Sequence, residues 1–416
     1  MFKKPNYLLY LFVSLLAFAS SLRYGFSQDD WYFLLISRAE SFTDILNFFN
    51  PFTQSGFAFF RPLGTQLYYF LFQGNPFPMH LFMLGVQAFN GFLVSRLLLR
   101  ANFRPMVAAL AGVLYTASAV HFLSLYYVAA TQQLLAATFA LLSLLAYLSR
   151  RPWLSALTFT LALLCKETAI VIPIVAYFLL ASTPLLPRLS RLTPFFLVTL
   201  FYFIFRYVSP HSLQSEYHFY FGPSLLTNLR WYVLFASNFP EMLVNYGLPK
   251  MGINFSRFLV EFGWRAWLIT GISGFLAIFS MLRLLITRSW RYGLWFAAGL
   301  APVLVLRNHL YPHYLDLSLI PFLLLLLEGL TTRAQLVLSV LYLTTSLLST
   351  SLSVDYHWTT NRALMAERAR HELDWSTICQ HSPIVFTGNG DIPRQYSYTL
   401  SLANGPRVIC QNEELE

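Results

Sequence analysis

Charged side chains are scarce in this chain of 416 residues: Asp, Glu, Lys and Arg together make up 11% of it. Soluble domains carry roughly 25% charged residues, so an ordinary soluble protein is excluded. Cysteine is also rare, with three residues, which excludes a secreted scaffold held together by disulfides. Hydrophobic residues make up 56% of the chain and the mean hydropathy is +0.55, which excludes a disordered, collagen-like or coiled-coil protein. A membrane-embedded chain with many spans remains.

The net charge of +10 raises the question of a nucleic-acid partner. The 28 Lys and Arg residues are scattered between apolar runs, however, and form no dense basic stripe. The sequence also has no Walker loop, no dinucleotide fingerprint and no Gly-x-Ser-x-Gly motif. Nucleic acid is therefore rejected as a partner, and the basic loop residues are expected to set the orientation of the chain in the membrane.

About eleven apolar runs are predicted to span the membrane, where a span needs about 20 mostly apolar residues. A cleaved signal peptide is the alternative for the first run, because Ala17-Phe18-Ala19 resembles a cleavage site. Two further runs, 62–73 and 225–247, would invert the charge bias downstream if they crossed. They are expected to be interfacial or re-entrant helices on the outer side. The predicted spans are 6–22, 78–99, 105–122, 126–148, 152–165, 168–183, 193–208, 264–286, 292–306, 314–330 and 334–353.

The loops between these runs differ in charge, and this difference predicts the orientation. Arginines gather in alternate short loops, which the positive-inside rule assigns to the cytoplasm together with the N-terminus. Of the acidic residues before position 354, only Glu328 lies at an inner end, and all nine histidines fall outside. We therefore expect a plasma- or inner-membrane protein with extracytoplasmic polar chemistry. The inner-loop arginines are Arg96, Arg100, Arg104, Arg150, Arg151, Arg188, Arg191, Arg283, Arg288, Arg291 and Arg333.

The last part of the chain, 354–416, differs in kind from the membrane domain predicted over 1–353. It mixes acidic and basic residues with turn signals and short strand-like runs such as Arg407-Val408-Ile409, so a small extracytoplasmic αβ appendage is predicted. Cys379 and Cys410 both lie in it, and in an oxidising compartment they could pair. Two unpaired cysteines in a small core are the alternative.

Two adjacent carboxylates, Asp29 and Asp30, open the first outer loop directly after the first span. Neighbouring residues point to different sides of a helix, so the two acids are not expected to share one task. One of them can act as a general base that takes a proton from an attacking hydroxyl. The alternative is structural, because Ser27-x-x-Asp30 fits a helix capping box that an amphipathic helix follows.

Cationic residues suited to a phosphate follow in three places. Arg61 ends the same loop, and its alternative role is that of an interfacial arginine that snorkels. Lys166 and Glu167 lie between two apolar runs, where Lys166 could face a phosphate and Glu167 could hold that lysine or a sugar hydroxyl. A polar hinge with helix capping is the alternative for this pair. Arg307 begins the third group.

The third group is dense in hydrogen-bond donors and aromatic rings at the outer ends of two spans. His309 and His313 are four residues apart, which suggests a metal, but Pro312 between them argues against a regular helix. No cofactor is therefore expected, and a divalent metal is kept as an alternative. His121 ends an earlier span. It is either a satisfied interfacial histidine or, with His309, His313 and Tyr314, part of a substrate-binding surface.

The ordered set of these landmarks resembles the GT-C superfamily of polytopic glycosyltransferases. It is closest to the protein O-mannosyltransferase-like branch and is also similar to the lipid A aminoarabinose transferases. The resemblance covers about residues 1–353 and implies a GT-C-type helical membrane fold. Besides the paired acids and Arg61-Pro62-Leu63, it rests on Asn75-Pro76-Phe77, His80, Asn90, Ala119-Val120-His121, Lys166-Glu167-Thr168-Ala169, His313-Tyr314-Leu315 and Pro321.

The resemblance implies an enzyme that moves a hexose or pentose, with inversion, from a dolichyl- or undecaprenyl-type polyprenyl-phosphate carrier. The acceptor is a glycan, lipid or protein outside the cytoplasm, and membrane lipids are the other partners. By this resemblance Asp29 is the base, with Asp30 second, and Arg61 binds the donor phosphate, with Lys166 and Arg307 as further candidates. A lipid or glycan transporter or flippase is the alternative, but it would place ionisable residues deep within the spans, where this sequence has almost none.

Overall fold

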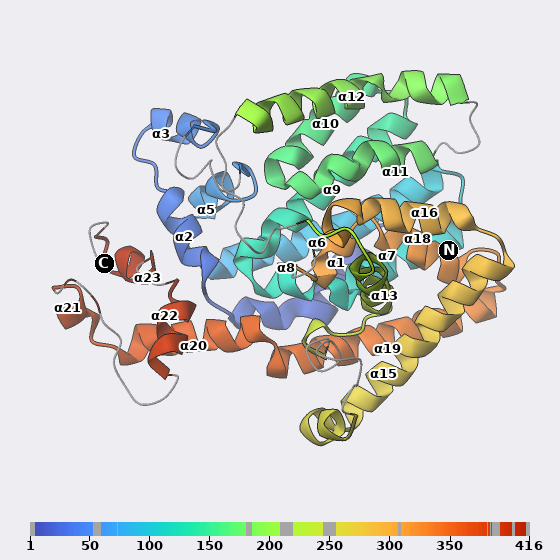
Figure 1. The fold of residues 1–416 in the computed structure, drawn as a ribbon. Coiled ribbons are helices and arrows are strands. Elements are labelled where there is room, and N and C mark those ends of the chain that lie inside the picture. Colours follow the sequence, from blue (N-terminus) through green and yellow to red (C-terminus); the bar gives the residue numbers. More distant parts are fainter. Residues whose placement is uncertain are drawn as a thin grey trace.

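The computed structural model describes residues 5–52, 60–72, 74–179, 185–208, 219–243, 255–306, 309–380, 382, 384, 392–401 and 404–412. These residues fold as helices (Figure 1). Within the described ranges no strand forms, and one isolated β-bridge joins Phe219 to Leu306. Large apolar side chains lie on the surface, among them Val260 with 88% and Ile286 with 77% of their areas exposed, as expected where lipid replaces water. The all-helical class predicted for the membrane domain is therefore confirmed.

Among the described residues, five helical stretches are long and apolar enough to cross a bilayer, and four shorter apolar helices accompany them. The predicted count of about eleven spans is not confirmed. The runs 292–306 and 314–330 break into α16 (Trp290–Gly299), α17 (Ala301–Leu304) and α18 (Leu319–Leu327). Helix α18 extends about 14 Å at 1.5 Å per residue, against a bilayer core of about 30 Å. The five stretches are Pro76–Arg100, Pro105–Tyr126, Val128–Leu148, Val260–Ile286 and Thr332–Glu372; the shorter ones are Tyr7–Arg23, Pro152–Cys165, Glu167–Leu179 and Arg191–Phe205.

Four neighbouring helices form the centre of the bundle: α6 (Pro76–Arg100), α7 (Pro105–Ala117), α9 (Thr131–Leu148) and α10 (Pro152–Cys165). Three of them begin with proline, whose missing N–H is not needed at the first helical position. A Cβ atom on Gly91 would lie 2.8 Å from the Gly112 carbonyl oxygen, so glycine is required where α6 meets α7. The surrounding helices are α1 (Tyr7–Phe18), α11 (Ile172–Leu179), α12 (Leu185–Val208), α15 (Phe255–Ile286) and α19 (Thr332–Tyr356).

The two runs predicted to be interfacial or re-entrant contain short helices, α5 (Gln66–Phe72) and α13 (Ser224–Ala236). At 1.5 Å per residue these helices extend about 10 Å and about 20 Å, which is too short to cross a core of about 30 Å. Residues 244–247 of the second run lie outside the described residues. The first outer loop adds α2 (Asp29–Ile36) and α3 (Phe42–Asn47).

The described part of the C-terminal tail consists of α20 (Trp358–Glu372), α21 (Trp375–Ile378), α22 (Ile392–Thr399) and α23 (Asn404–Ile409). The strand predicted at Arg407-Val408-Ile409 is wrong, because these residues belong to α23. Their β-forming tendency is outweighed by tertiary contacts: α23 packs on α2, and a disulfide joins the next residue, Cys410, to Cys379. Most of the other predicted strand, 384–386, lies outside the described residues, and α19 continues past the predicted boundary at 353.

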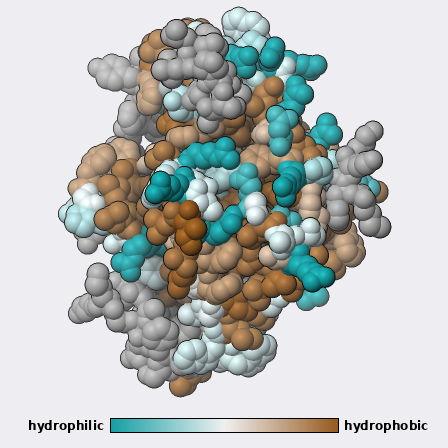
Figure 2. All heavy atoms as spheres, turned by 90° about the vertical axis from the view of Figure 1, so that its right-hand side faces the viewer, coloured by the Kyte–Doolittle hydropathy of each residue, from teal (hydrophilic) through white to brown (hydrophobic). Residues whose placement is uncertain are grey.

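The two ends of the bundle differ. Figure 1 places α2, α3 and α5 at the same end as the tail helices, and the N-terminus with the turn from α15 to α16 at the other. Figure 2 views this second end and shows hydrophilic side chains gathered across its middle, with hydrophobic ones around them. The α15–α16 turn contains Arg288, and Arg291 follows in α16; both are among the predicted inner-loop arginines.

Candidate functional site

The two acids of the first outer loop form the first turn of α2 and face different surroundings. Asp30 is buried: its Oδ2 accepts a hydrogen bond from the Ser27 backbone N–H at 2.8 Å, and its Oδ1 accepts one from the Tyr69 hydroxyl at 2.5 Å. Burial raises the pKa of Asp30 to about 7, although both hydrogen bonds lower it. Asp30 therefore anchors the start of α2 to α5. The predicted capping box forms only in part, because the N-cap of α2 is Gln28 and no side-chain hydrogen bond caps the helix.

Asp29 is exposed. Its backbone N–H donates to the Tyr127 hydroxyl at 3.0 Å, and that hydroxyl also lies beside the Asp29 carboxylate. Tyr127 belongs to a buried cluster against which Phe33, Tyr311 and Trp358 pack. Asp29 thus offers a solvent-accessible carboxylate next to the aromatic rings packed around Tyr127. A general base in this position can contact a substrate.

Arg61 lies opposite two partners from distant parts of the chain. Its Nε donates to Glu167 Oε2 at 2.7 Å, a second guanidinium N–H donates to Glu167 Oε1, and a third donates to Gln132 Oε1 at 3.0 Å. Arg61 is buried while the Glu167 side chain is 42% exposed. The two-pronged contact fixes the plane of the guanidinium group, so Glu167 is placed to orient Arg61.

The close approach of this segment to the ends of α9 and α10 explains how Arg61 reaches its partners. The Leu63 backbone N–H donates to the Leu164 carbonyl oxygen at 3.2 Å. A Cβ atom on Gly64 would lie 2.7 Å from the Cys165 carbonyl oxygen and equally close to the Gln132 Cβ atom. Only glycine fits here, and the tight crossing places Arg61 against the start of α9 and the junction after α10.

Lys166 is the C-cap of α10, and its ammonium lies 4.9 Å from the centre of the Tyr314 ring. Burial, and then the charge of Arg61, lower the pKa of Lys166 to about 7, although Glu167 and Asp316 act in the other direction. Burial also lowers the pKa of His309 to about 4 and takes that of His313 well below its ordinary value, with Lys166 as the next cause for both. The structure thus brings together Arg61 and Lys166 with two neutral histidines.

Lys166 gives a testable pH dependence. Below pH 7 its ammonium is already charged, whereas above pH 7 an anion must bring a proton with it, so affinity falls by up to about tenfold per pH unit. We expect this fall between pH 7 and 9 for a short-chain prenyl phosphodiester of a sugar, whose own charge does not change there. Lys166→Arg stays charged and should flatten the dependence. An unchanged slope in Lys166→Arg would assign the titration to another group.

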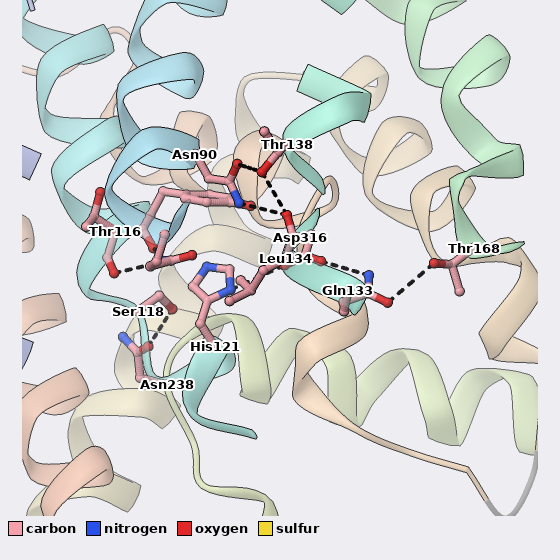
Figure 3. Close-up of polar contacts among 12 residues, drawn as sticks. Asn90, Thr116, Ser118, His121, Gln133, Leu134, Thr138, Thr168, Asn238 and Asp316 are labelled. Carbon is pink, nitrogen blue, oxygen red and sulfur yellow. Dashed lines mark hydrogen bonds and ion pairs between the residues drawn. The ribbon is translucent and has the colours of Figure 1, made fainter. Parts of the chain in front are cut away.

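A second polar group, which contains His121, Gln133 and Asp316, lies inside the protein (Figure 3). His121, at the end of η2 (Ala119–His121), has its Nδ1 3.2 Å from Asp316 Oδ1, and both side chains are buried. Gln133 Nε2 donates to Asp316 Oδ2 at 2.7 Å, and Thr168 donates to Gln133 at 3.4 Å. His121 therefore contacts a carboxylate inside the protein. The same carboxylate, that of Asp316, is one of the charges that act on Lys166.

His313 and Tyr314 lie in η7 (Pro312–Leu315), and His309 precedes it; the rings of His309 and Tyr314 are 5.8 Å apart. These residues form a short 3-10 turn and no regular α-helix, as Pro312 led us to expect. Arg307 lies outside the described residues. In the part of the chain that the structure describes, no group of three or more His, Cys, Asp or Glu side chains could hold a metal ion.

The sequence analysis did not predict five residues of the site: Tyr69, Tyr127, Gln132, Gln133 and Asp316. Tyr69 lies within an apolar run and carries no signal of its own. The pair Gln132-Gln133 does carry one, because two adjacent amides at the start of an otherwise apolar run need polar partners. Their partners, Arg61 and Asp316, are both charged.

Comparison of the chain with protein families, with curated proteins and with solved structures finds no match.

Proposed function

We propose that this protein is an integral-membrane glycosyltransferase that moves a sugar from a polyprenyl-phosphate carrier to an extracytoplasmic hydroxyl or amine. The observation that carries the proposal is an accessible carboxylate, Asp29, that packed aromatic rings link to a pair of buried cationic side chains, Arg61 and Lys166. Tyr311 packs on the same cluster as Tyr127, and its ring lies 6.3 Å from that of Tyr314, over which Lys166 lies. The packed rings of Tyr127, Tyr311 and Tyr314 thus connect the acid to Lys166.

The chemistry that this arrangement suits is a single displacement. Asp29 accepts the proton of the acceptor hydroxyl or amine, whose oxygen or nitrogen forms a bond to the anomeric carbon of the sugar. The bond from that carbon to the phosphate oxygen breaks, and the polyprenyl phosphate leaves with the electron pair. Attack opposite the leaving group inverts the anomeric centre. Cations close to the phosphate stabilise the charge that develops on it.

The electrostatics of the cation cluster favour an anionic ligand. Burial, and then the charge of Arg61, make the ammonium form of Lys166 unfavourable, and Glu167 and Asp316 offset this effect only in part. A further negative charge close to Lys166 would favour its ammonium form. A bound phosphodiester would supply that charge. Because Glu167 and Gln132 already orient Arg61, little reorganisation is needed when the phosphate arrives.

The proposed placement has the N-terminus in the cytoplasm and the site outside, in the plasma or inner membrane. Helix α2, which carries Asp29, lies at the same end of the bundle as the tail (Figure 1). The tail contains the Cys379–Cys410 disulfide, which suits an oxidising compartment. The inner-loop arginines suit the opposite, cytoplasmic end.

Analysis of the lipid that co-purifies with the protein tests the proposal. Wild type and Asp29→Asn are purified in mild detergent, and the extracted lipids are analysed by mass spectrometry. We expect a polyprenyl-phosphate sugar in both samples, enriched in Asp29→Asn because transfer is blocked after binding. Polyprenyl phosphate without a sugar, or no isoprenoid phosphate at all, in either sample would contradict the proposal. Transport of a lipid or glycan by reconstituted protein would then be measured instead.

A further inference from the structure

A cavity lies on the opposite face of α2 from Asp29. It has a volume of about 630 Å³, within the range of small-molecule sites, and it lies between α2, α5 and the tail. Trp31 and Leu34 of α2 line it, three residues apart on one helix face. Asp29 and Phe33, four residues apart, belong to the other face, where Phe33 packs on the Tyr127 cluster. The cavity therefore lies on the other side of α2 from Asp29, and Tyr69, whose hydroxyl donates to Asp30, borders it.

The lining of this cavity is amphipathic. Apolar side chains come from both walls: Phe26, Trp31 and Leu34 from the first loop, and Val408 and Ile409 from α23. Two arginines and one glutamate supply the charge, so the lining is net positive. Arg370 does contact Glu367 at 3.4 Å, but both side chains are more than two-fifths exposed, and such pairs contribute little. The charged lining residues are Arg38, Arg370 and Glu40.

The indole of Trp31 provides an independent indication of a ligand. Trp31 is 2% exposed, and among the described residues its Nε1–H has no hydrogen-bond acceptor. A buried donor without an acceptor is costly, and buried tryptophans usually find one. Trp31 also lines the cavity, so a bound molecule that displaces the atoms around Nε1 can supply this acceptor.

The position of the cavity indicates where that molecule comes from. Helix α2 follows the first apolar helix directly, and Gly74 lines the cavity just before α6 begins, so the cavity lies at the level where apolar helices end. The adjacent α3 segment exposes apolar side chains: Phe42 has 72%, Leu46 56% and Phe52 58% of its area exposed. A segment of this kind lies in the interface of a bilayer. The cavity thus lies at a level that a lipid head group can reach.

We propose that this cavity binds the head group and first chain carbons of an anionic phospholipid from the adjacent leaflet. The phosphate faces Arg38 and Arg370, the chain lies against the apolar walls, and a phosphate or ester oxygen accepts the Trp31 N–H. The site requires no transfer chemistry, so it stands or falls independently of the proposed sugar transfer.

Native mass spectrometry of the detergent-purified full chain tests the site, with phosphatidylglycerol and phosphatidylcholine as probes. We expect one phosphatidylglycerol to be retained at least tenfold more strongly than phosphatidylcholine. Arg38→Gln combined with Arg370→Gln should remove this preference. The matched control is Arg368→Gln, which removes an exposed arginine of the same helix, α20, that does not line the cavity. Equal retention of both lipids by the wild type would overturn the proposal.

Four further measurements distinguish a lipid cavity from an anion site on the protein surface. Trp31→Phe removes the N–H together with part of the ring and should weaken phosphatidylglycerol severalfold, whereas Arg38→Lys keeps the charge and should bind. Ala39→Phe narrows the cavity without changing charge and should also reduce binding. Glycerol phosphate, the head group alone, should not displace the lipid at equal concentration. Displacement by glycerol phosphate, or unchanged binding in both Trp31→Phe and Ala39→Phe, would show a surface anion site and overturn the lipid assignment.

Discussion

Replacing Asp29 by asparagine is expected to abolish sugar transfer while the protein still inserts into the membrane and binds its donor. Asparagine has nearly the same shape but cannot take a proton from the acceptor, and general-base catalysis typically contributes about 10²- to 10⁴-fold. The rate should therefore fall by that factor. The measurement uses membranes that contain the protein and their own acceptors, with radiolabelled polyprenyl-phosphate mannose, glucose and aminoarabinose as donors, and follows label that leaves the polyprenyl-phosphate sugar for any other product.

The neighbouring acid provides the sharpest comparison. Asp30→Asn keeps one oxygen to accept the Ser27 N–H, and its amide N–H can donate to the Tyr69 hydroxyl oxygen. It removes a carboxylate that lies away from the exposed surface. Its effect on transfer should be at least tenfold smaller than that of Asp29→Asn. Glu372→Gln removes an exposed acid of the tail and should be silent. If Asp29→Asn keeps activity within a few-fold of wild type, or if Asp30→Asn has the larger effect, Asp29 is not the base.

Hydropathy predicted the long helices because it records which residues avoid water. The runs 78–99 and 334–353 correspond to α6 and α19, whose bounds lie within a few residues of them. It failed for 292–306 and 314–330, where apolar composition continues but the helices stop. A run of apolar residues is compatible with several short buried helices as well as with one span, so composition alone cannot count spans.

The contacts within the site were beyond sequence analysis. The residue types were identified, because carboxylates and cations stand out in a chain with 11% charged residues. Arg61 and Glu167, however, are 106 positions apart, and nothing in either segment names the other. The sequence also left open which acid of the pair has the structural role at the start of α2. The burial of Asp30 against Tyr69 answers that question, and it depends on how α5 folds back onto α2.

Arg61→Ala is expected to weaken donor binding by about 10- to 150-fold, because hydrogen bonds to charged groups contribute about 1.5–3 kcal/mol. Acceptor binding should change little. The measurement is the affinity for a short-chain prenyl phosphodiester of a sugar, with the KM of donor and acceptor compared where transfer is assayed. A control comes from the Arg265–Asp355 ion pair, at 2.7 Å, which takes no part in the site. Arg265→Ala should leave donor affinity unchanged.

Arg61→Ala alone is ambiguous, because it also leaves the Glu167 carboxylate without its partner, and that carboxylate would repel a phosphate. Combining Arg61→Ala with Glu167→Gln removes this charge. If Arg61 binds the phosphate itself, the double variant stays weak, since the guanidinium is still missing. If Arg61 only neutralises Glu167, the double variant regains most of the wild-type affinity, and the phosphate role passes to Lys166. Glu167→Gln by itself should weaken the donor less than Arg61→Ala, because it loosens the orientation of a cation that is still present.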